Sequence, residues 1–391
     1  MTKKYCIIGA SAAGVAAAKK IRQLDDAGDI TCFTAEPQVP YNKCFLVDYV
    51  AGIKPYGDLG IFTESDIRAK RVNLLTDCPI ISIDPQAQCI VDVHGVSHAY
   101  DALLIATGSK AFVPFPDHCR TDIFTFHTLN DINSLVARIF RSQSKRIVII
   151  GAGLTGIEAC DALLRMQCDV TIVESKPHIL STLIASQAAD FLSERLKGAG
   201  VKVVTSGFVM SIEKENNVVQ GVSLSNGDFL PADIVICAVG QRPNTDLANN
   251  VGSQMCNGYL IVDQYQATTI QSIFAAGDCV MVQDARTGQL MPSVSWPDAM
   301  QQGICAAYAM VGKPQPYRGL TSLISSSFFG VNVTVGGYLK ERSHYNIADS
   351  ITFSAYERTA TNDNNELDHF VFIGSDMNRL RQLRVAFMSK I

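Results

Sequence analysis

Short apolar runs that end in glycine-rich turns recur along this chain. The first run, Tyr5–Ile8, leads into the turn Gly9–Gly14 and a helical pattern, and a second run, Ile30–Phe33, is followed by Glu36. We predict a strand, a turn, a helix and a second strand that ends near an acid. In such a unit, backbone N–H groups at the positive end of the helix bind a dinucleotide pyrophosphate, and the acid binds ribose hydroxyls.

A second copy of the pattern begins at Arg146. The run Arg146–Ile150 leads into a turn with glycines at 151, 153 and 156, a helical pattern, the run Val170–Val173 and Glu174. Glu174 follows Gly151 by 23 positions, close to the spacing of a dinucleotide unit. An acid at this place favours NADH over NADPH, although Lys176 is nearby. Two copies predict two bound nucleotides.

Three further apolar runs also end in glycine turns. They lead into Ala106-Thr107-Gly108, into Gly240 and into Gly277-Asp278. Beside a nucleotide turn, the Ala106-Thr107-Gly108 turn would contact the adenosine half of a cofactor. Asp278 is a candidate ligand for a ribitol chain. Ser11 stands where the second glycine of the first turn is usual, so we expect its side chain to point away from the phosphate.

Composition narrows the class of protein. The 391 residues allow two or three domains, and a net charge of −4 gives no general attraction to nucleic acid or anionic membrane. The twelve cysteines contain no CxxC pair, so we expect free thiols in a reducing compartment and no metal site. Lys3-Lys4 before an apolar run looks like a signal peptide, but the same residues supply the first strand and helix. No apolar run reaches eighteen residues, and we expect a cytoplasmic protein.

Two segments remain open to alternative interpretations. Cys44 follows Lys43 near a predicted helix start, where it is either a thiol of lowered pKa or a small apolar side chain under a cofactor. The last part of the chain, about 314–391, predicts two or three short strands and a final helix. That helix carries Arg379, Arg381 and Arg384, either on an ordinary amphipathic surface, which we favour, or on a face that docks an acidic protein.

Together these motifs resemble the pyridine nucleotide–disulfide oxidoreductases and their non-disulfide relatives, over nearly the whole chain. The resemblance implies an α/β fold with two Rossmann-like dinucleotide-binding domains, the NAD domain being inserted in the FAD domain, plus a small α+β C-terminal domain. The implied boundaries are 1–112 and 238–313 for FAD, 113–237 for NAD(H) and 314–391 for the last domain. The implied cofactors are FAD and NADH.

The family's functional positions map onto residues of this chain. The implied FAD site consists of Gly9, Ser11, Ala12, Ala13, Gly14, Glu36, Lys43, Ile80, Ala106, Thr107, Gly108, Gly277, Asp278, Trp296 and Ala299. The implied NAD site consists of Gly151, Gly153, Leu154, Thr155, Gly156, Glu158, Glu174 and Gly240. The implied catalytic residues are Cys44, Lys43 and Glu158. Ser295 predicts the start of a helix whose positive end would stabilise a reduced flavin.

Within the family, the segment after Pro40 is similar to two groups. Tyr41-Asn42-Lys43 resembles the NADH:rubredoxin and flavorubredoxin reductases, whereas Cys44 lies eight residues before Gly52, as in NADH peroxidases, NADH oxidases and CoA-disulfide reductases. The peroxidase histidine would fall at Ala12, and a lysine of some relatives would fall at Asp48.

We therefore expect an NADH-dependent FAD reductase that passes electrons to a small carrier protein of the rubredoxin or flavorubredoxin kind, as a monomer or a homodimer. A Cys44-dependent reductase of oxygen, peroxide, CoA disulfide or polysulfide is the alternative. A flavin-binding scaffold that senses NADH is a third interpretation.

Overall fold

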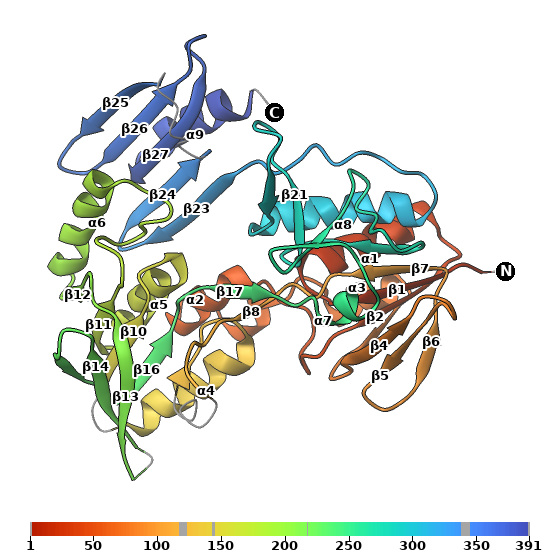
Figure 1. The fold of residues 1–391 in the computed structure, drawn as a ribbon, viewed down its shortest axis with the longest axis horizontal. Coiled ribbons are helices and arrows are strands. Elements are labelled where there is room, and N and C mark those ends of the chain that lie inside the picture. The colour runs from red at the N-terminus through yellow and green to blue at the C-terminus, as the bar shows by residue number, and fades with distance from the viewer. Residues whose placement is uncertain (1, 117–122, 143–144, 217, 338–344, 390–391) are drawn as a thin grey trace.

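The structure is a computed structural model that describes residues 2–116, 123–142, 145–216, 218–337 and 345–389. The chain forms three modules (Figure 1), two built on parallel sheets and one, at the C-terminus, on an antiparallel sheet. The insertion predicted from the sequence is present, because strands of the second sheet lie in sequence between strands of the first.

The first module is built on a parallel sheet whose strand order is β20-β7-β1-β2-β3. Its strands are β20 (Ile273–Ala275), β7 (Ala102–Ile105), β1 (Lys4–Ile8), β2 (Asp29–Phe33) and β3 (Val72–Leu75). Tyr5 and Ile7 pack beneath the helices α1 (Ala12–Leu24) and α8 (Trp296–Met310), while Cys6 and Ile8 face the opposite side. Because both faces are covered, the strand is apolar along almost its whole length.

Two small sheets cover that opposite side. One contains β4 (Ile80–Asp84), β5 (Cys89–Asp92) and β6 (Ser97–Ala99). The other contains β18 (Met255–Cys256), β19 (Tyr259–Ile261), β21 (Val280–Gln283) and β22 (Leu290–Pro292). Shorter elements complete the module: η1 (Lys43–Phe45), α2 (Leu46–Val50), η2 (Tyr56–Leu59), α3 (Glu64–Ala69) and α7 (Asp246–Asn250).

The second module repeats this design with the strand order β12-β11-β10-β16-β9. Its parallel strands are β12 (Lys202–Val204), β11 (Asp169–Val173), β10 (Arg146–Ile150), β16 (Ile234–Cys237) and β9 (Ile123–Phe124). Its helices are α4 (Leu129–Arg141), α5 (Leu154–Arg165) and α6 (Ser186–Gly198). An antiparallel sheet of β13 (Val209–Glu215), β14 (Val218–Leu224) and β15 (Phe229–Pro231) packs on its other face.

The two modules are joined by a short antiparallel pair, β8 (Ser109–Ala111) with β17 (Gln241–Pro243). A shared apolar core also links them, because Leu46 and Val50 of α2 pack with Leu129 and Ile132 of α4. The segment after Pro40 therefore belongs to the first module in sequence but contributes to the core of the second.

The C-terminal module contains five strands rather than the two or three predicted, with the order β23-β24-β27-β26-β25. The strands are β23 (Leu323–Phe328), β24 (Val331–Gly336), β27 (Leu367–Gly374), β26 (Tyr356–Thr361) and β25 (Asn346–Ile351), and α9 (Met377–Met388) packs against one face. The prediction was wrong because β25 is exposed at every position and so lacks the apolar alternation that marks a half-buried strand.

Candidate functional site

One continuous cavity of about 2030 Å³ lies among the three modules. Its wall includes nearly all the predicted site residues of both nucleotide units, together with Cys44, Lys43 and Glu158. Gly14 and Gly156, the third glycines of the two turns, are the exceptions, since neither is part of the wall.

The two glycine turns have the same construction. Gly9 and Gly151 both have φ near +105°, and a Cβ on them would lie 2.0 Å from the carbonyl oxygen of Ala106 and 2.5 Å from that of Ala238. A Cβ on Gly14 would lie 1.8 Å from the Gly9 oxygen, and the corresponding distance from Gly156 to Gly151 is 2.1 Å. The third glycine therefore lets the helix pack onto its own turn, which explains its absence from the cavity wall.

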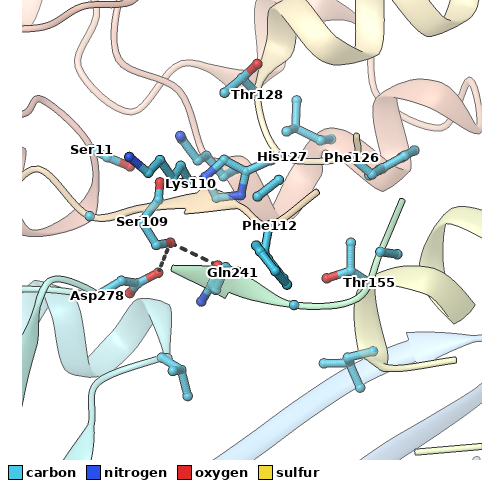
Figure 2. A pocket seen from close by; sticks show the side chains of 18 of the residues that line it. Ser11, Ser109, Lys110, Phe112, Phe126, His127, Thr128, Thr155, Gln241 and Asp278 are labelled. Atoms are coloured by element: carbon cyan, nitrogen blue, oxygen red, sulfur yellow. Dashed lines mark hydrogen bonds between the residues drawn. The ribbon is translucent and has the colours of Figure 1, made fainter. Parts of the chain in front are cut away.

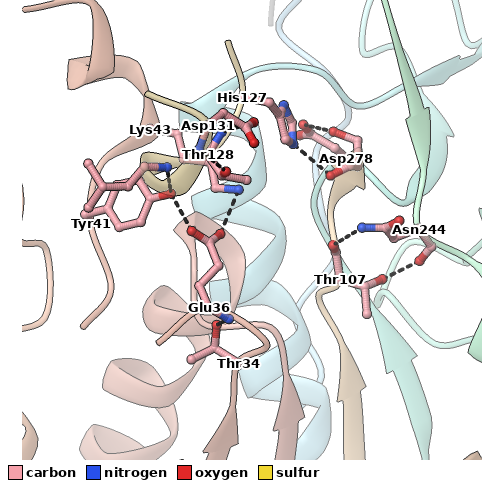
Figure 3. Close-up of polar contacts among 12 residues, drawn as sticks. Thr34, Glu36, Tyr41, Lys43, Thr107, His127, Thr128, Asp131, Asn244 and Asp278 are labelled. Carbon is pink, nitrogen blue, oxygen red and sulfur yellow. Dashed lines mark hydrogen bonds and ion pairs between the residues drawn. The ribbon is translucent and has the colours of Figure 1, made fainter. Parts of the chain in front are cut away.

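Glu36 lies in a network of polar contacts that the sequence did not reveal (Figure 3). The Tyr41 hydroxyl donates to Oε2 of Glu36 at 2.5 Å, and Lys43 Nζ lies 3.1 Å from Oε1. The same hydroxyl accepts a hydrogen bond from the backbone N–H of Leu129, at the first residue of α4. Lys43, predicted as a catalytic cation, is thus paired with the acid of the first nucleotide unit.

Glu174 occupies the equivalent place in the second unit, but its partners are two backbone N–H groups and the hydroxyl of the adjacent Ser175, which donates to Oε1 at 3.2 Å. Its carboxylate accepts hydrogen bonds from the N–H of Ala152 and from the N–H of Lys176, each at 2.8 Å. The acid therefore stabilises the second glycine turn from the end of the neighbouring strand β11.

The two segments that connect the first module to the second bring further polar residues into the cavity wall. Thr107 donates through Oγ1 to the Asn244 carbonyl oxygen at 2.5 Å, and Asn244 Nδ2 donates back to the Thr107 oxygen at 3.3 Å (Figure 3). The pairing of β8 with β17 creates this contact, which joins the Ala106-Thr107-Gly108 turn to the turn after Gly240.

Ser109 and Gln241 lie beside Asp278, His127 lies next to Ser109, and none of the three was predicted (Figure 2). The Ser109 hydroxyl is 2.9 Å from Gln241 Oε1 and 3.3 Å from Asp278 Oδ2, and His127 Nε2 is 2.9 Å from the Ser109 carbonyl oxygen. Burial raises the pKa of Asp278, while the hydroxyl contact and Lys43 oppose that rise. Their positions in the sequence could have revealed two of these residues, because Ser109 directly follows the motif glycine Gly108 and Gln241 directly follows Gly240.

Cys44 lies on η1, with its side chain exposed to the cavity. Burial of the thiol by the surrounding protein raises its pKa to about 11, and the charges of Glu158 and Asp278 add to this rise. The direction of this shift is opposite to the lowered pKa that the position of Cys44 near a helix start suggested.

Glu158 lies at the start of the second turn of α5 and is half-buried. Burial raises the pKa of Glu158, and the charge of Asp48 raises it further. A hydrogen bond from the Ser326 hydroxyl, on β23 of the C-terminal module, opposes this rise. Asp48 thus acts on Glu158 in the direction opposite to the lysine found there in some relatives. The three modules meet at this carboxyl group.

The residues present fit two dinucleotides. Gly108 and Gly153 line the cavity and have no atom within 4 Å of the position of a Cβ, so a ligand can approach their backbone closely. The helices α1, α5 and α8 all begin at the cavity, and Ser295 caps α8 as predicted by accepting from the N–H of Asp298 at 3.2 Å. Helix N-termini of this kind stabilise anionic groups.

Two further observations concern the described residues only. None of their helices combines the length and the apolar character that crossing a membrane requires. Their eleven cysteines are all free, and no group of three or more histidine, cysteine, aspartate or glutamate side chains among them is arranged to hold a metal ion.

Comparison with known proteins places the chain among flavin-dependent reductases. A family model described as pyridine nucleotide-disulphide oxidoreductase matches residues 3–303. An NADH oxidase of Methanocaldococcus jannaschii is 30% identical over 82% of this chain and 72% of its own length, and a rubredoxin-NAD(+) reductase of Ectopseudomonas oleovorans is 26% identical over 79% and 80%. The solved structure of a ferredoxin reductase from Rhodopseudomonas palustris matches with a TM-score of 0.90 at 25% identity, over 99% of this chain and 95% of the other. The chain therefore belongs to the pyridine nucleotide-disulphide oxidoreductases, and it is an oxidoreductase that uses FAD and NADH.

Proposed function

We propose that this protein takes a hydride from NADH and passes the electrons to a small carrier protein of the rubredoxin or ferredoxin kind. The observation that carries the proposal is the single cavity whose wall contains both glycine turns and the carboxylates of Glu158 and Asp278. The rubredoxin-NAD(+) reductase and the ferredoxin reductase among the similar proteins support the choice of carrier. Bound FAD supplies the chemistry that accepts a hydride and releases single electrons.

We further propose the domain boundaries and residue roles expected from the resemblance. Residues 1–112 and 238–313 form the FAD unit, 113–237 the NADH unit and 314–391 a C-terminal module. The position of β16 between β7 and β20 in sequence supports this division. The free cysteines of the described residues support a further proposal, that the protein works in the reducing cytoplasm.

The protein's part in the reaction is to hold the two nucleotides in register. Glu36 binds the adenosine ribose of FAD, Asp278 its ribitol, and the start of α1 its pyrophosphate. The start of α5 faces the pyrophosphate of NADH, and Glu174 its ribose. Glu158, half-buried and held by Ser326, orients the nicotinamide beside the flavin. Lys43 acts through its ion pair with Glu36, at the adenosine end.

The choice of hydride donor tests the role of Glu174. Stopped-flow bleaching of the flavin is expected to be at least about tenfold more efficient with NADH than with NADPH, since the 2′-phosphate of NADPH would meet a like charge. Faster bleaching with NADPH would contradict this role of Glu174.

The alternative function, a Cys44-dependent reduction of oxygen, peroxide or disulfides, has one observation in its favour. The Cys44 side chain is exposed within the cavity, near Glu158 and Asp278, and one relative is an NADH oxidase. Its raised pKa argues against it, because the thiolate is the reactive form.

Replacing Cys44 by serine separates the two functions. We expect Cys44→Ser to change the rate of rubredoxin reduction less than about twofold, because a hydroxyl of similar size preserves the packing. Cys256→Ser, at a half-buried thiol on β18, is the matched control. Assays with rubredoxin, peroxide and CoA disulfide measure the effect. Loss of peroxide or disulfide turnover in Cys44→Ser alone would establish the thiol mechanism instead.

A further inference from the structure

The three arginines of α9 have different surroundings. Arg379 forms an ion pair with Glu357 of β26, so its charge is locally neutralised. Arg381 is exposed and Arg384 half-buried, and neither makes an ion pair with a described residue. Among the described residues, two arginines on one helix of the C-terminal module therefore have no carboxylate partner.

Arg384 is part of the cavity wall, and its guanidinium group is incompletely hydrogen-bonded. Its Nη2 donates to the Ser325 hydroxyl at 2.6 Å, whereas its Nε is buried without a hydrogen-bond partner among the described residues. A guanidinium group offers five donors in a planar fork that suits a carboxylate. The surroundings thus supply a hydroxyl but no anion.

The alternation of β23 places Arg384 away from the nicotinamide side of the cavity. Ser326 points toward α5 and donates to Glu158, while the flanking residue Ser325 points toward α9 and contacts Arg384. Successive side chains of a strand lie on opposite faces of the sheet. Arg384 therefore reaches the cavity wall from the side of α9 and not from the side of α5 that carries Glu158.

Exposed apolar residues continue from Arg384 along the helix. Arg381, Arg384, Val385 and Met388 follow the spacing i, i+3, i+4, i+7, which places them along one side of α9. Val385 is 63% exposed and Met388 36%, while Leu380, Leu383 and Phe387 form the buried face. Arginine and methionine are enriched in protein interfaces, and lysine is depleted.

We propose that these four residues, the α9 rim, dock an acidic carrier protein, with Arg384 receiving a carboxylate beside the cavity opening. The inference rests on the proposed function and specifies the charge of its partner. Charge complementarity is the argument for this occupant, because two cations that pair with no carboxylate of the described residues stand next to the exposed apolar side chains. We expected α9 to be an ordinary amphipathic helix. In this proposal its exposed side also docks the carrier protein.

The experiment compares wild type, Arg384→Gln and the double variant Arg381→Gln/Arg384→Gln, with an acidic rubredoxin as acceptor. We expect KM for rubredoxin to rise about tenfold in the double variant and its salt dependence to flatten, since rim charges act mainly on association. Turnover with menadione, an uncharged small acceptor, should stay within about twofold of wild type, because no docking is needed. Arg141→Gln, which removes an exposed arginine of α4, controls for the change in net charge.

The outcomes separate the docking inference from the proposed function. If wild type does not reduce rubredoxin or ferredoxin, the proposed function fails. If wild type reduces rubredoxin and the double variant has an unchanged KM, the α9 rim is not the docking site. A changed oligomeric mass with an unchanged KM would assign this face to a second copy of the chain, and a parallel loss of menadione turnover would place Arg384 in the flavin site; each result overturns the inference.

Discussion

Alanine at Gly156 is expected to abolish flavin reduction by NADH, whereas alanine at Gly153 should leave the fold intact. A Cβ on Gly156 would lie 2.1 Å from the Gly151 carbonyl oxygen. The Cβ and this oxygen are both attached directly to backbone, so no side-chain rotation can relieve the contact. Relief requires α5 to move away from its turn, at a cost of about 3 kcal/mol or more. Gly153, in contrast, has a φ of −73° and no atom within 4 Å of a Cβ.

The Gly153→Ala protein thus isolates the contribution of backbone access. We expect its free energy of unfolding to change by less than about 1 kcal/mol, as for an exposed helix cap. Its KM for NADH should nonetheless rise about tenfold or more, because the methyl group stands where the pyrophosphate approaches the turn. Thermal unfolding and stopped-flow reduction measure the two effects. A fully active Gly156→Ala protein, or an unchanged KM in Gly153→Ala, would contradict the proposed nucleotide site.

Removal of the Tyr41 hydroxyl is expected to weaken FAD binding and to destabilise the protein. Tyr41→Phe leaves the buried N–H of Leu129 without its acceptor and Oε2 of Glu36 without its donor. The unsatisfied buried N–H of Leu129 costs about 1–3 kcal/mol. The altered position of Glu36 should raise the Kd for FAD by about tenfold, measured by fluorescence titration of the apoprotein, and lower Tm.

A neighbouring tyrosine provides the control. The Tyr49 hydroxyl lies 3.5 Å from Asn133 Oδ1, the limit of a hydrogen bond, and is partly exposed. Tyr49→Phe should therefore change the free energy of unfolding by less than about 0.5 kcal/mol and leave FAD binding unchanged. Equal effects of the two substitutions would mean that the Tyr41 hydroxyl does not position Glu36.

Local patterns predicted the elements that carry the nucleotide turns. The run Arg146–Ile150 is a strand with the predicted ends, and Ser295 caps α8. Strand, turn and helix follow from interactions between residues close in sequence, so alternation, glycine positions and caps reveal them. The exposed strand β25 was missed for the same reason, because pairing with β26, rather than an apolar pattern, makes it a strand.

What the sequence by itself determined is thus the pair of glycine turns, the acids that follow them and, through the resemblance, the family. Only the tertiary structure decided which residues meet. It paired Lys43 with Glu36, placed Ser326 on Glu158 and brought Arg384 beside Ser325 in the cavity wall, across sequence separations of up to 168 positions. Such contacts depend on how three modules pack against one another, and no local periodicity encodes that packing.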